Sequence, residues 1–253
     1  MRTRKFAIPM CLMLAACGPA RGKNPPREGD RAQQSYLWKK RNLPINGRYS
    51  LLPIEFYIDQ EATTEQQLAI ESAAQSWNNA VGFDLLRTSG LRENPLKSNP
   101  TDPFLLLNDG AIGVWFANDW SWMENSENAA GTTLWCFTHE ESEIGASDIY
   151  LNADENILGN FLKAPELEGL HVDTESLALH EFGHLLGLSH TTEEWDPNSV
   201  MHPVLPPFAK RQLTDKDIAI VRALYRDEWD ERLRWFQNNA NSSDSQTSCG
   251  KLP

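Results

Sequence analysis

Residues 180–190 constrain this chain more than any other stretch, because they read His-Glu-Phe-Gly-His-Leu-Leu-Gly-Leu-Ser-His. His180 and His184 are four residues apart, so on a helix both imidazoles project from one face. Gly187 is suited to end that helix, because glycine adopts the left-handed conformation common just after a helix. The chain can then turn and bring His190 to the same point. Three imidazole nitrogens that leave one coordination position open are typical of a catalytic Zn²⁺ site.

Glu181 follows the first histidine and is placed to contact a zinc-bound water rather than the ion. In that position it would act first as a general base and then as a proton donor. A three-residue match of this kind arises by chance at roughly one start in 8,000, and Gly187 with His190 lowers that by about 400-fold. A helix that merely carries solvated histidines is therefore a poor alternative.

The segments before the histidine run predict strands separated by loops. Strands are expected where apolar residues alternate with polar ones or gather in short runs. These strands are expected at residues 52–59, 83–86, 112–117, 132–137 and 148–152, with loops at 88–103 and 118–131.

Three segments predict helices. Apolar residues recur near helical spacing over residues 64–81. Residues 174–186 contain the histidine pair, and residues 214–225 open with Thr214 and Asp217 at capping-box spacing. Helices mixed with strands in this order predict an α+β domain.

The histidine run resembles the long zinc motif of the metzincins, and residues 199–203, Ser-Val-Met-His-Pro, resemble their Met-turn. The chain is most similar to the matrixins, which share the Phe-Gly pair inside the motif and Met-x-Pro at the turn. The resemblance covers about residues 49–226. It implies a metzincin fold, in which a twisted, mixed five-stranded sheet packs with three helices and the zinc lies in a cleft.

The resemblance also assigns chemical roles. It implies that His180, His184 and His190 bind one catalytic zinc and that Glu181 is the base. Met201 would form an apolar floor beneath the zinc without binding it.

Substrate contacts are implied in the same way. Residues 132–137 would form the edge strand that pairs with an extended protein or peptide substrate. Leu179 and Pro203 would border the specificity pocket just beyond the scissile bond.

Two further metal sites of the family are altered. The histidines of its structural zinc fall near Trp135 and Tyr150, so we expect that site to be missing. The positions of the family's calcium ligands correspond to Asn152 and Glu155 here, with Asp148 nearby. Calcium binding by these three residues is therefore possible.

The N-terminus predicts export and lipidation. Residues 1–16 combine a basic start with a short apolar run, which is typical of a signal peptide. The run ends in Leu-Ala-Ala before Cys17, which resembles the bacterial lipobox, so Cys17 would carry the lipid after cleavage. An ordinary cleaved signal with an incidental cysteine is the alternative. Gly18 after Cys17 implies the outer membrane of the cell envelope, at its periplasmic face or at the cell surface.

The remaining segments flank the domain. Residues 17–48 read as a lipidated basic tether, since residues 18–48 hold eight basic and two acidic side chains. Residues 227–253 form a polar C-terminal extension that is expected to be disordered towards its end. Cys136 and Cys249 would remain in an oxidising compartment, where they could pair or stay as free thiols.

Charge and hydropathy exclude some partners. The whole chain has a formal charge of −12, and residues 49–253 hold 12 basic and 33 acidic side chains. Nucleic acid is therefore not expected as a partner, because phosphate binding needs a positive surface. No run of 18 apolar residues occurs, so no membrane-spanning helix is expected. The lipid would then be the only membrane attachment. The protein is expected to be a monomer.

These features favour an envelope-anchored zinc endopeptidase. The alternative is a surface lipoprotein that contains zinc and binds a partner without turnover. A structural envelope protein with a chance motif is a third reading, and it predicts that no metal is bound.

Overall fold

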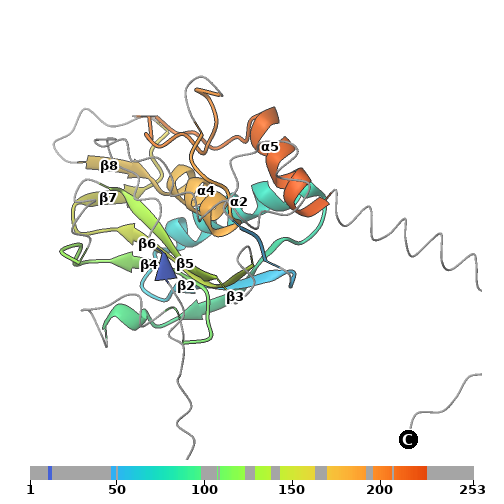
Figure 1. Cartoon of the computed structure of the whole chain (residues 1–253). Coiled ribbons are helices and arrows are strands. Elements are labelled where there is room, and N and C mark those ends of the chain that lie inside the picture. The colour runs from blue at the N-terminus through green and yellow to red at the C-terminus, as the bar shows by residue number, and fades with distance from the viewer. Residues whose placement is uncertain are drawn as a thin grey trace, which may run out of the picture.

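The computed structural model describes residues 11–12, 47–49, 51–97, 107, 109–122, 129–137, 143–162, 170–191, 196–206 and 208–226. Figure 1 shows the arrangement of the elements. The strands are β1 (Cys11–Leu12), β2 (Ile54–Asp59), β3 (Leu86–Arg92), β4 (Gly113–Ala117), β5 (Gly131–Phe137), β6 (Ile144–Asn152), β7 (Asn156–Gly159) and β8 (Leu170–Asp173). The helices are α2 (Thr64–Val81), α4 (Thr174–Leu185) and α5 (Asp215–Val221), with a 3₁₀ turn at Pro95–Lys97 and a π turn at Arg222–Arg226.

The sheet confirms the predicted mixed architecture. Five strands lie in the order β3-β2-β4-β6-β5, and the first four run parallel while β5 is antiparallel to β6. β1 pairs antiparallel with the outer side of β5 and makes the sheet six-stranded. β1 belongs to the stretch that we predict to be removed as a signal peptide.

Two helices cover one face of this sheet (Figure 1). α2 begins with a capping box, in which the Thr63 hydroxyl accepts from Gln66 N while the Gln66 side chain accepts from Thr63 N. It ends at Gly82, whose φ of 83° is the left-handed conformation that favours glycine. Trp77 is fully buried and donates from Nε1 to Leu179 O over 3.0 Å, which ties α2 to α4.

The core has two parts because neighbouring residues of a strand point to opposite faces. In β6, Ile149 and Leu151 pack in the main cluster with α2 and α4. Tyr150, which lies between them, packs on the other face in a second cluster that includes Trp115 and Trp120. Each face of the central strands is thus covered by apolar residues, which explains why these strands are nearly continuously buried.

The prediction of a strand at residues 83–86 was wrong in its position. β3 begins at Leu86 and continues to Arg92, through residues expected to be a loop. Asn78 binds the chain just before it, because its Oδ1 accepts from Leu85 N and Leu86 N at 2.9 and 2.8 Å. β3 is the outer strand beside β2, and its residues 87–91 are exposed, so it lacks the apolar pattern of a buried strand.

Three other elements also differ from the sequence-based prediction. β6 starts at Ile144 rather than 148, and the helix predicted over 214–225 changes from α to π geometry after Val221. The parallel pair β7–β8 was not expected. Its strands are four residues long, and Leu170 pairs with Asn156 from far along the chain, so no local pattern marks them.

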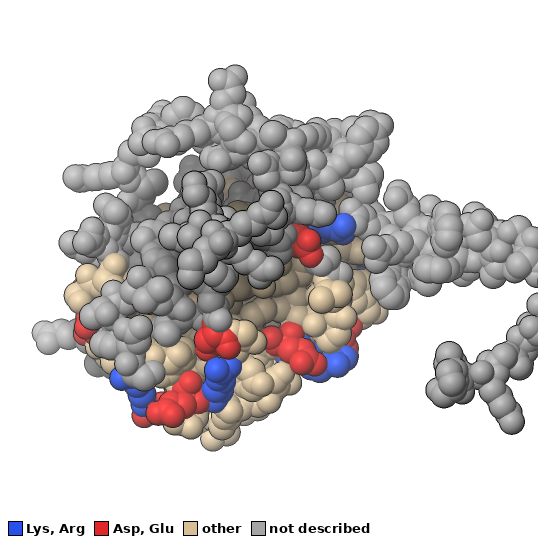
Figure 2. Space-filling model, turned by 60° about the horizontal axis from the view of Figure 1, so that its bottom comes forward, with Lys and Arg blue, Asp and Glu red and all other residues tan. Residues whose placement is uncertain are grey.

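Figure 2 turns the lower side of the molecule forward. Acidic and basic side chains lie next to one another there. Ion pairs among the described residues include those of Arg87 with Asp84 and Glu55, Arg92 with Asp109, and Lys97 with Glu61. No described helix is both long and apolar enough to cross a membrane.

Candidate metal centre

α4 carries the first two histidines, and both of its ends are defined by specific contacts. Asp173 caps its start, since its Oδ2 accepts from Ser176 N and Ser176 Oγ at 3.0 and 2.6 Å. Gly187 follows its end with a φ of 95°, as predicted. Leu188 N then donates to Gly183 O over 2.9 Å, and this turn directs the chain back toward α4.

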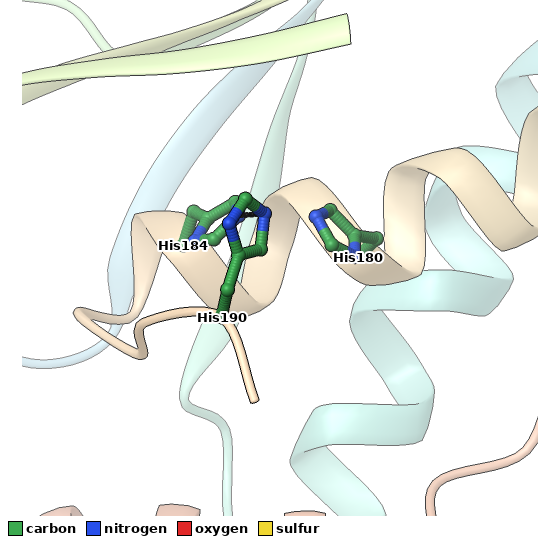
Figure 3. Close-up of side chains that lie close together, drawn as sticks. All are labelled: His180, His184 and His190. Carbon is green, nitrogen blue, oxygen red and sulfur yellow. Dashed lines mark hydrogen bonds between the residues drawn. The ribbon is translucent and has the colours of Figure 1, made fainter. Parts of the chain in front are cut away.

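The turn brings His190 against His180 and His184, so the three predicted ligands meet (Figure 3). One potential ligand atom from each histidine lies within 4.8 Å of those of the other two. The Nε2 atoms of His184 and His190 are 3.1 Å apart. His180 and His184 are fully buried and His190 is partly buried. They are the one group of three potential metal ligands found among the described residues.

Backbone carbonyls orient two of the rings. His180 Nδ1 lies 2.6 Å from Val200 O, and His184 Nδ1 lies 2.9 Å from Leu188 O. A carbonyl only accepts, so each Nδ1 must carry the proton and donate it. The lone pair is then on Nε2, the nitrogen that would bind a metal.

Burial keeps the three imidazoles neutral. Loss of hydration, together with the neighbouring His190, lowers the pKa of His180 to about 3. Burial also lowers the pKa of His190 to about 4 and that of His184 well below the ordinary value. Neutral imidazoles are the form that binds metal, so protons do not compete with a metal at neutral pH.

The cluster fits zinc. Two nitrogens at 2.0–2.1 Å from a tetrahedral ion are about 3.3 Å apart, close to the 3.1 Å between His184 Nε2 and His190 Nε2. Three neutral nitrogen donors also match the donor set of catalytic zinc sites.

Met201 of the turn at residues 199–203 packs against α4 at Gly183, and its role as an apolar floor beneath a zinc ion stays a prediction. It is fully buried, and a Cβ on Gly183 would overlap its sulfur. The turn is held by Asp217, whose carboxylate accepts from Ser199 Oγ at 2.5 Å and from Val200 N at 3.0 Å. Since Val200 O in turn accepts from His180, this buried acid supports the orientation of a predicted metal ligand.

Glu181 lies on α4 and its side chain points toward the sheet. Its side chain is fully buried, and Thr133 Oγ1 of β5 donates to its Oε2 over 2.7 Å. Thr133 also lies 3.1 Å from the Glu181 carbonyl oxygen. β5 and α4 therefore meet at the residue that we expect to act as the base.

The structure does not assemble the predicted calcium ligands. Asp148 is buried inside the sheet, whereas Asn152 lies four residues further along β6, or roughly 13 Å at strand spacing. Asp148 accepts from Gly113 N and Trp115 Nε1, both at 2.8 Å. Asn152 does lie beside Glu155, since Glu155 N donates to its Oδ1 over 3.1 Å. Including Asp148 in one calcium site was therefore wrong, because strand geometry separates it from the other two.

Other predicted residues are placed as follows. Leu179 is fully buried in the main core and Pro203 is partly exposed, so their role beside a substrate pocket stays a prediction. Trp135 and Tyr150, at the positions of the family's structural zinc, are both buried.

Cys136 is disulfide-bonded, and Cys17 and Cys249 lie outside the described residues, so lipidation and the Cys136–Cys249 pairing stay predictions.

Sequence reasoning missed Thr133 and Asp217 as parts of the site. Asp217 was recognised only as a helix-capping residue, and the structure shows that it also binds the Met-turn. Thr133 had no local signal, because the alternation of a strand shows which face it is on but not what it meets there.

Comparison with known proteins adds the family. Residues 108–226 match the family described as Matrixin. The chain is 27% identical to matrix metalloproteinase-20 of Homo sapiens over 191 residues, which are 74% of this chain and 32% of that protein. It is 51% identical to metalloendoproteinase 1-MMP of Arabidopsis thaliana over 55 residues, which are 21% of this chain and 14% of that protein.

Among solved structures, high choriolytic enzyme 1, a hatching-enzyme zinc protease of Oryzias latipes (medaka), aligns with a TM-score of 0.35 and 15% identity. The alignment covers 71% of this chain and 92% of that one. The chain spans about a third or less of the length of the two sequence relatives. Because the Matrixin match runs from before β4 through α4 and the Met-turn to residue 226, the chain carries a matrixin-like metzincin domain.

Proposed function

We propose that this domain is a zinc-dependent endopeptidase that hydrolyses peptide bonds in a protein or peptide substrate. The observation that carries the proposal is the convergence of three neutral histidines, two of them fully buried, beside Glu181 of α4. The Matrixin match and the names of the sequence relatives support it. Those relatives are much longer than the matched part, so the activity is inferred from the site.

The three histidines would hold the ion through Nε2 while Val200 O and Leu188 O keep two of the rings in place. A zinc ion bound there supplies Lewis acidity, which polarises a carbonyl and lowers the pKa of a water. Glu181 takes the proton of the attacking water as the C–O bond forms. It then gives that proton to the leaving nitrogen as the C–N bond breaks.

β5 is the strand against which a substrate would lie. Its outer side accepts an antiparallel partner in this structure, where Cys11 and Leu12 lie opposite Cys136 and Trp135. If residues 1–16 are removed as a signal peptide, this edge is released for an extended substrate to pair with by main-chain hydrogen bonds.

The test is metal analysis and peptide-library cleavage on residues 18–253, with a Glu181→Ala variant beside the wild type. We expect about one zinc per chain in both proteins, and cleavage by the wild type that a chelator abolishes. The variant should lose activity by a factor of 10² or more, because it lacks the base. A Glu181→Ala protein that binds zinc and cleaves as fast as the wild type would disprove the mechanism.

Two other results would favour the alternatives. Zinc binding without cleavage of any unfolded protein would favour the non-catalytic binding lipoprotein. A chain that binds no metal would favour a structural protein with a chance motif.

We further propose that the enzyme is a monomer held at the bacterial envelope, most simply at the outer membrane, by a lipid on Cys17. The support is the order of the basic start, the apolar run and the small residues before Cys17. The basic segment of residues 18–48 would separate the domain from the membrane.

A further inference from the structure

One hydrogen bond near the metal centre joins two elements that are distant in sequence. Thr133 of β5 and Glu181 of α4 are both fully buried and are 48 positions apart. The Thr133 hydroxyl has one proton, and the shorter of its two contacts, 2.7 Å, reaches Glu181 Oε2. A donor to a buried carboxylate is worth more than one at the surface, because water cannot replace it.

The neighbouring residue on the same face of β5 shapes the other side of the carboxylate. Gly131 is two positions before Thr133, so both face α4. A Cβ placed on Gly131 would lie 3.2 Å from Glu181 Oε1 and 3.1 Å from Leu177 Cδ1. The carboxylate is thus packed over β5, with Gly131 leaving room for one oxygen and Thr133 holding the other.

We propose that Thr133 is a positioning residue for the general base. Its hydroxyl holds one carboxylate oxygen of Glu181, so the side chain keeps a single orientation while the other oxygen exchanges the proton. This inference rests on the proposed peptidase function. Thr133 does not touch the substrate or the ion in this role and acts only through Glu181.

The physical reason for such a contact is orientation. A glutamate side chain has three rotatable bonds, and a base that is displaced by about 1 Å can lose as much as 10² in rate. Valine has the shape of threonine without the hydroxyl, and serine keeps the hydroxyl without the methyl group. The pair of substitutions therefore separates the hydrogen bond from the packing.

The first experiment compares Thr133→Val and Thr133→Ser with the wild type in peptide cleavage and zinc content. Thr133→Val should lower kcat by roughly 10-fold or more, with KM within about twofold and zinc per chain unchanged, because only the base is disturbed. Thr133→Ser should stay within about threefold of the wild-type kcat. The matched control is Thr174→Val in α4, whose fully buried hydroxyl has no hydrogen-bond partner among the described residues and whose removal should leave kcat unchanged.

The second experiment needs no activity. Thermal unfolding of the metal-free protein should show a lower Tm for Thr133→Val, because Glu181 loses its donor. The same substitution in a Glu181→Ala background should lower Tm by much less, because the partner is already gone. If Thr133→Val lowers Tm equally in the wild type and in Glu181→Ala, the hydrogen bond between Thr133 and Glu181 does not contribute to stability, and the inference is overturned.

Failure of the inference differs from failure of the proposed function. If the wild type cleaves peptides and Thr133→Val cleaves them equally well, Thr133 has no positioning role. Equal losses in Thr133→Val and Thr133→Ser would also overturn it, since packing would then explain both. If the wild type binds zinc but cleaves nothing, the peptidase function falls, and with it this role, even where the Tm data show coupling.

Discussion

Asp148 illustrates at the scale of one residue how burial changes the chemistry of a side chain. It lies inside the sheet, where Gly113 N and Trp115 Nε1 donate to its Oδ1. Burial outweighs these two hydrogen bonds and raises the pKa of Asp148 well above its ordinary value of 3.8. The folded protein therefore binds this proton more tightly than the unfolded chain, and stability falls as the pH rises from 3.8 through the raised pKa.

Asp148→Asn should remove that cost. The amide keeps an acceptor for both donors and cannot ionise, so the variant should be more stable than the wild type at pH 8 and lose this advantage at about pH 4. Urea unfolding at pH 4, 6 and 8 measures the difference. Asp84→Asn, at an acid whose side chain is 66% exposed, is the control for the same substitution at the surface. A difference for Asp148→Asn that does not change with pH would contradict the raised pKa.

The same scale shows what a sequence can predict about the site. His180, Glu181, His184 and His190 were predicted because helix geometry and one glycine turn place them together within 11 residues. Thr133 comes from another strand, and its contact with Glu181 depends on how β5 and α4 pack. Local rules thus predict the histidine cluster and the adjacent glutamate, but not the residue of another strand that binds this glutamate.

At the scale of elements, α4 depends on contacts at its N-terminal end. Arg211 donates from Nε to Asp173 Oδ2 over 3.0 Å and also pairs with Glu175 at 3.1 Å. Burial would raise the pKa of Asp173, but hydrogen bonds from Arg211 and Ser176 outweigh it and lower the pKa. The stabilisation from this acid is therefore present at neutral pH and is lost as the pH falls through its folded pKa.

Asp173→Ala should destabilise the domain by about 2 kcal/mol, because the helix cap and the partner of Arg211 are both removed. Asp173→Asn should cost less, since asparagine is also a good N-cap and only the charge is lost. Urea unfolding of the two variants at pH 7 tests this. Equal losses would show that the ion pair rather than the cap stabilises α4.

Elements differed in how well they were predicted, for physical reasons. The helices at 64–81 and 174–185 matched closely, since apolar spacing and terminal residues such as Thr63 and Gly187 are local signals. β3 was missed because its stability comes from pairing with β2 at the side of the sheet and not from its own apolar residues. The pair β7–β8 was not predicted for a similar reason, since each strand is stabilised by a partner that lies outside its own stretch of the sequence.

At the scale of the whole molecule, the two ends of the described domain meet at the end of α4. Tyr225 donates from its hydroxyl to Leu186 O over 2.9 Å and accepts from Tyr49 N at 3.2 Å. A Cβ on Gly187 would overlap Gly47 O, so the N-terminal segment also lies against this turn. Residues 47–49, Tyr225 and the turn after α4 therefore contact one another, although they are distant in sequence.

The last prediction concerns the anchor. A lipid on Cys17 would leave residues 18–46 between the membrane and the domain, a span on the order of 100 Å when extended, so anchoring and catalysis should be independent. Cys17→Ser should move the protein from the membrane fraction to the soluble fraction and abolish incorporation of labelled palmitate. It should leave kcat/KM on a short peptide unchanged, because the site lies in the folded domain. Cys249→Ser is the matched control and should still sediment with membranes. A Cys17→Ser protein that also sediments with membranes would show that something other than this lipid holds it there.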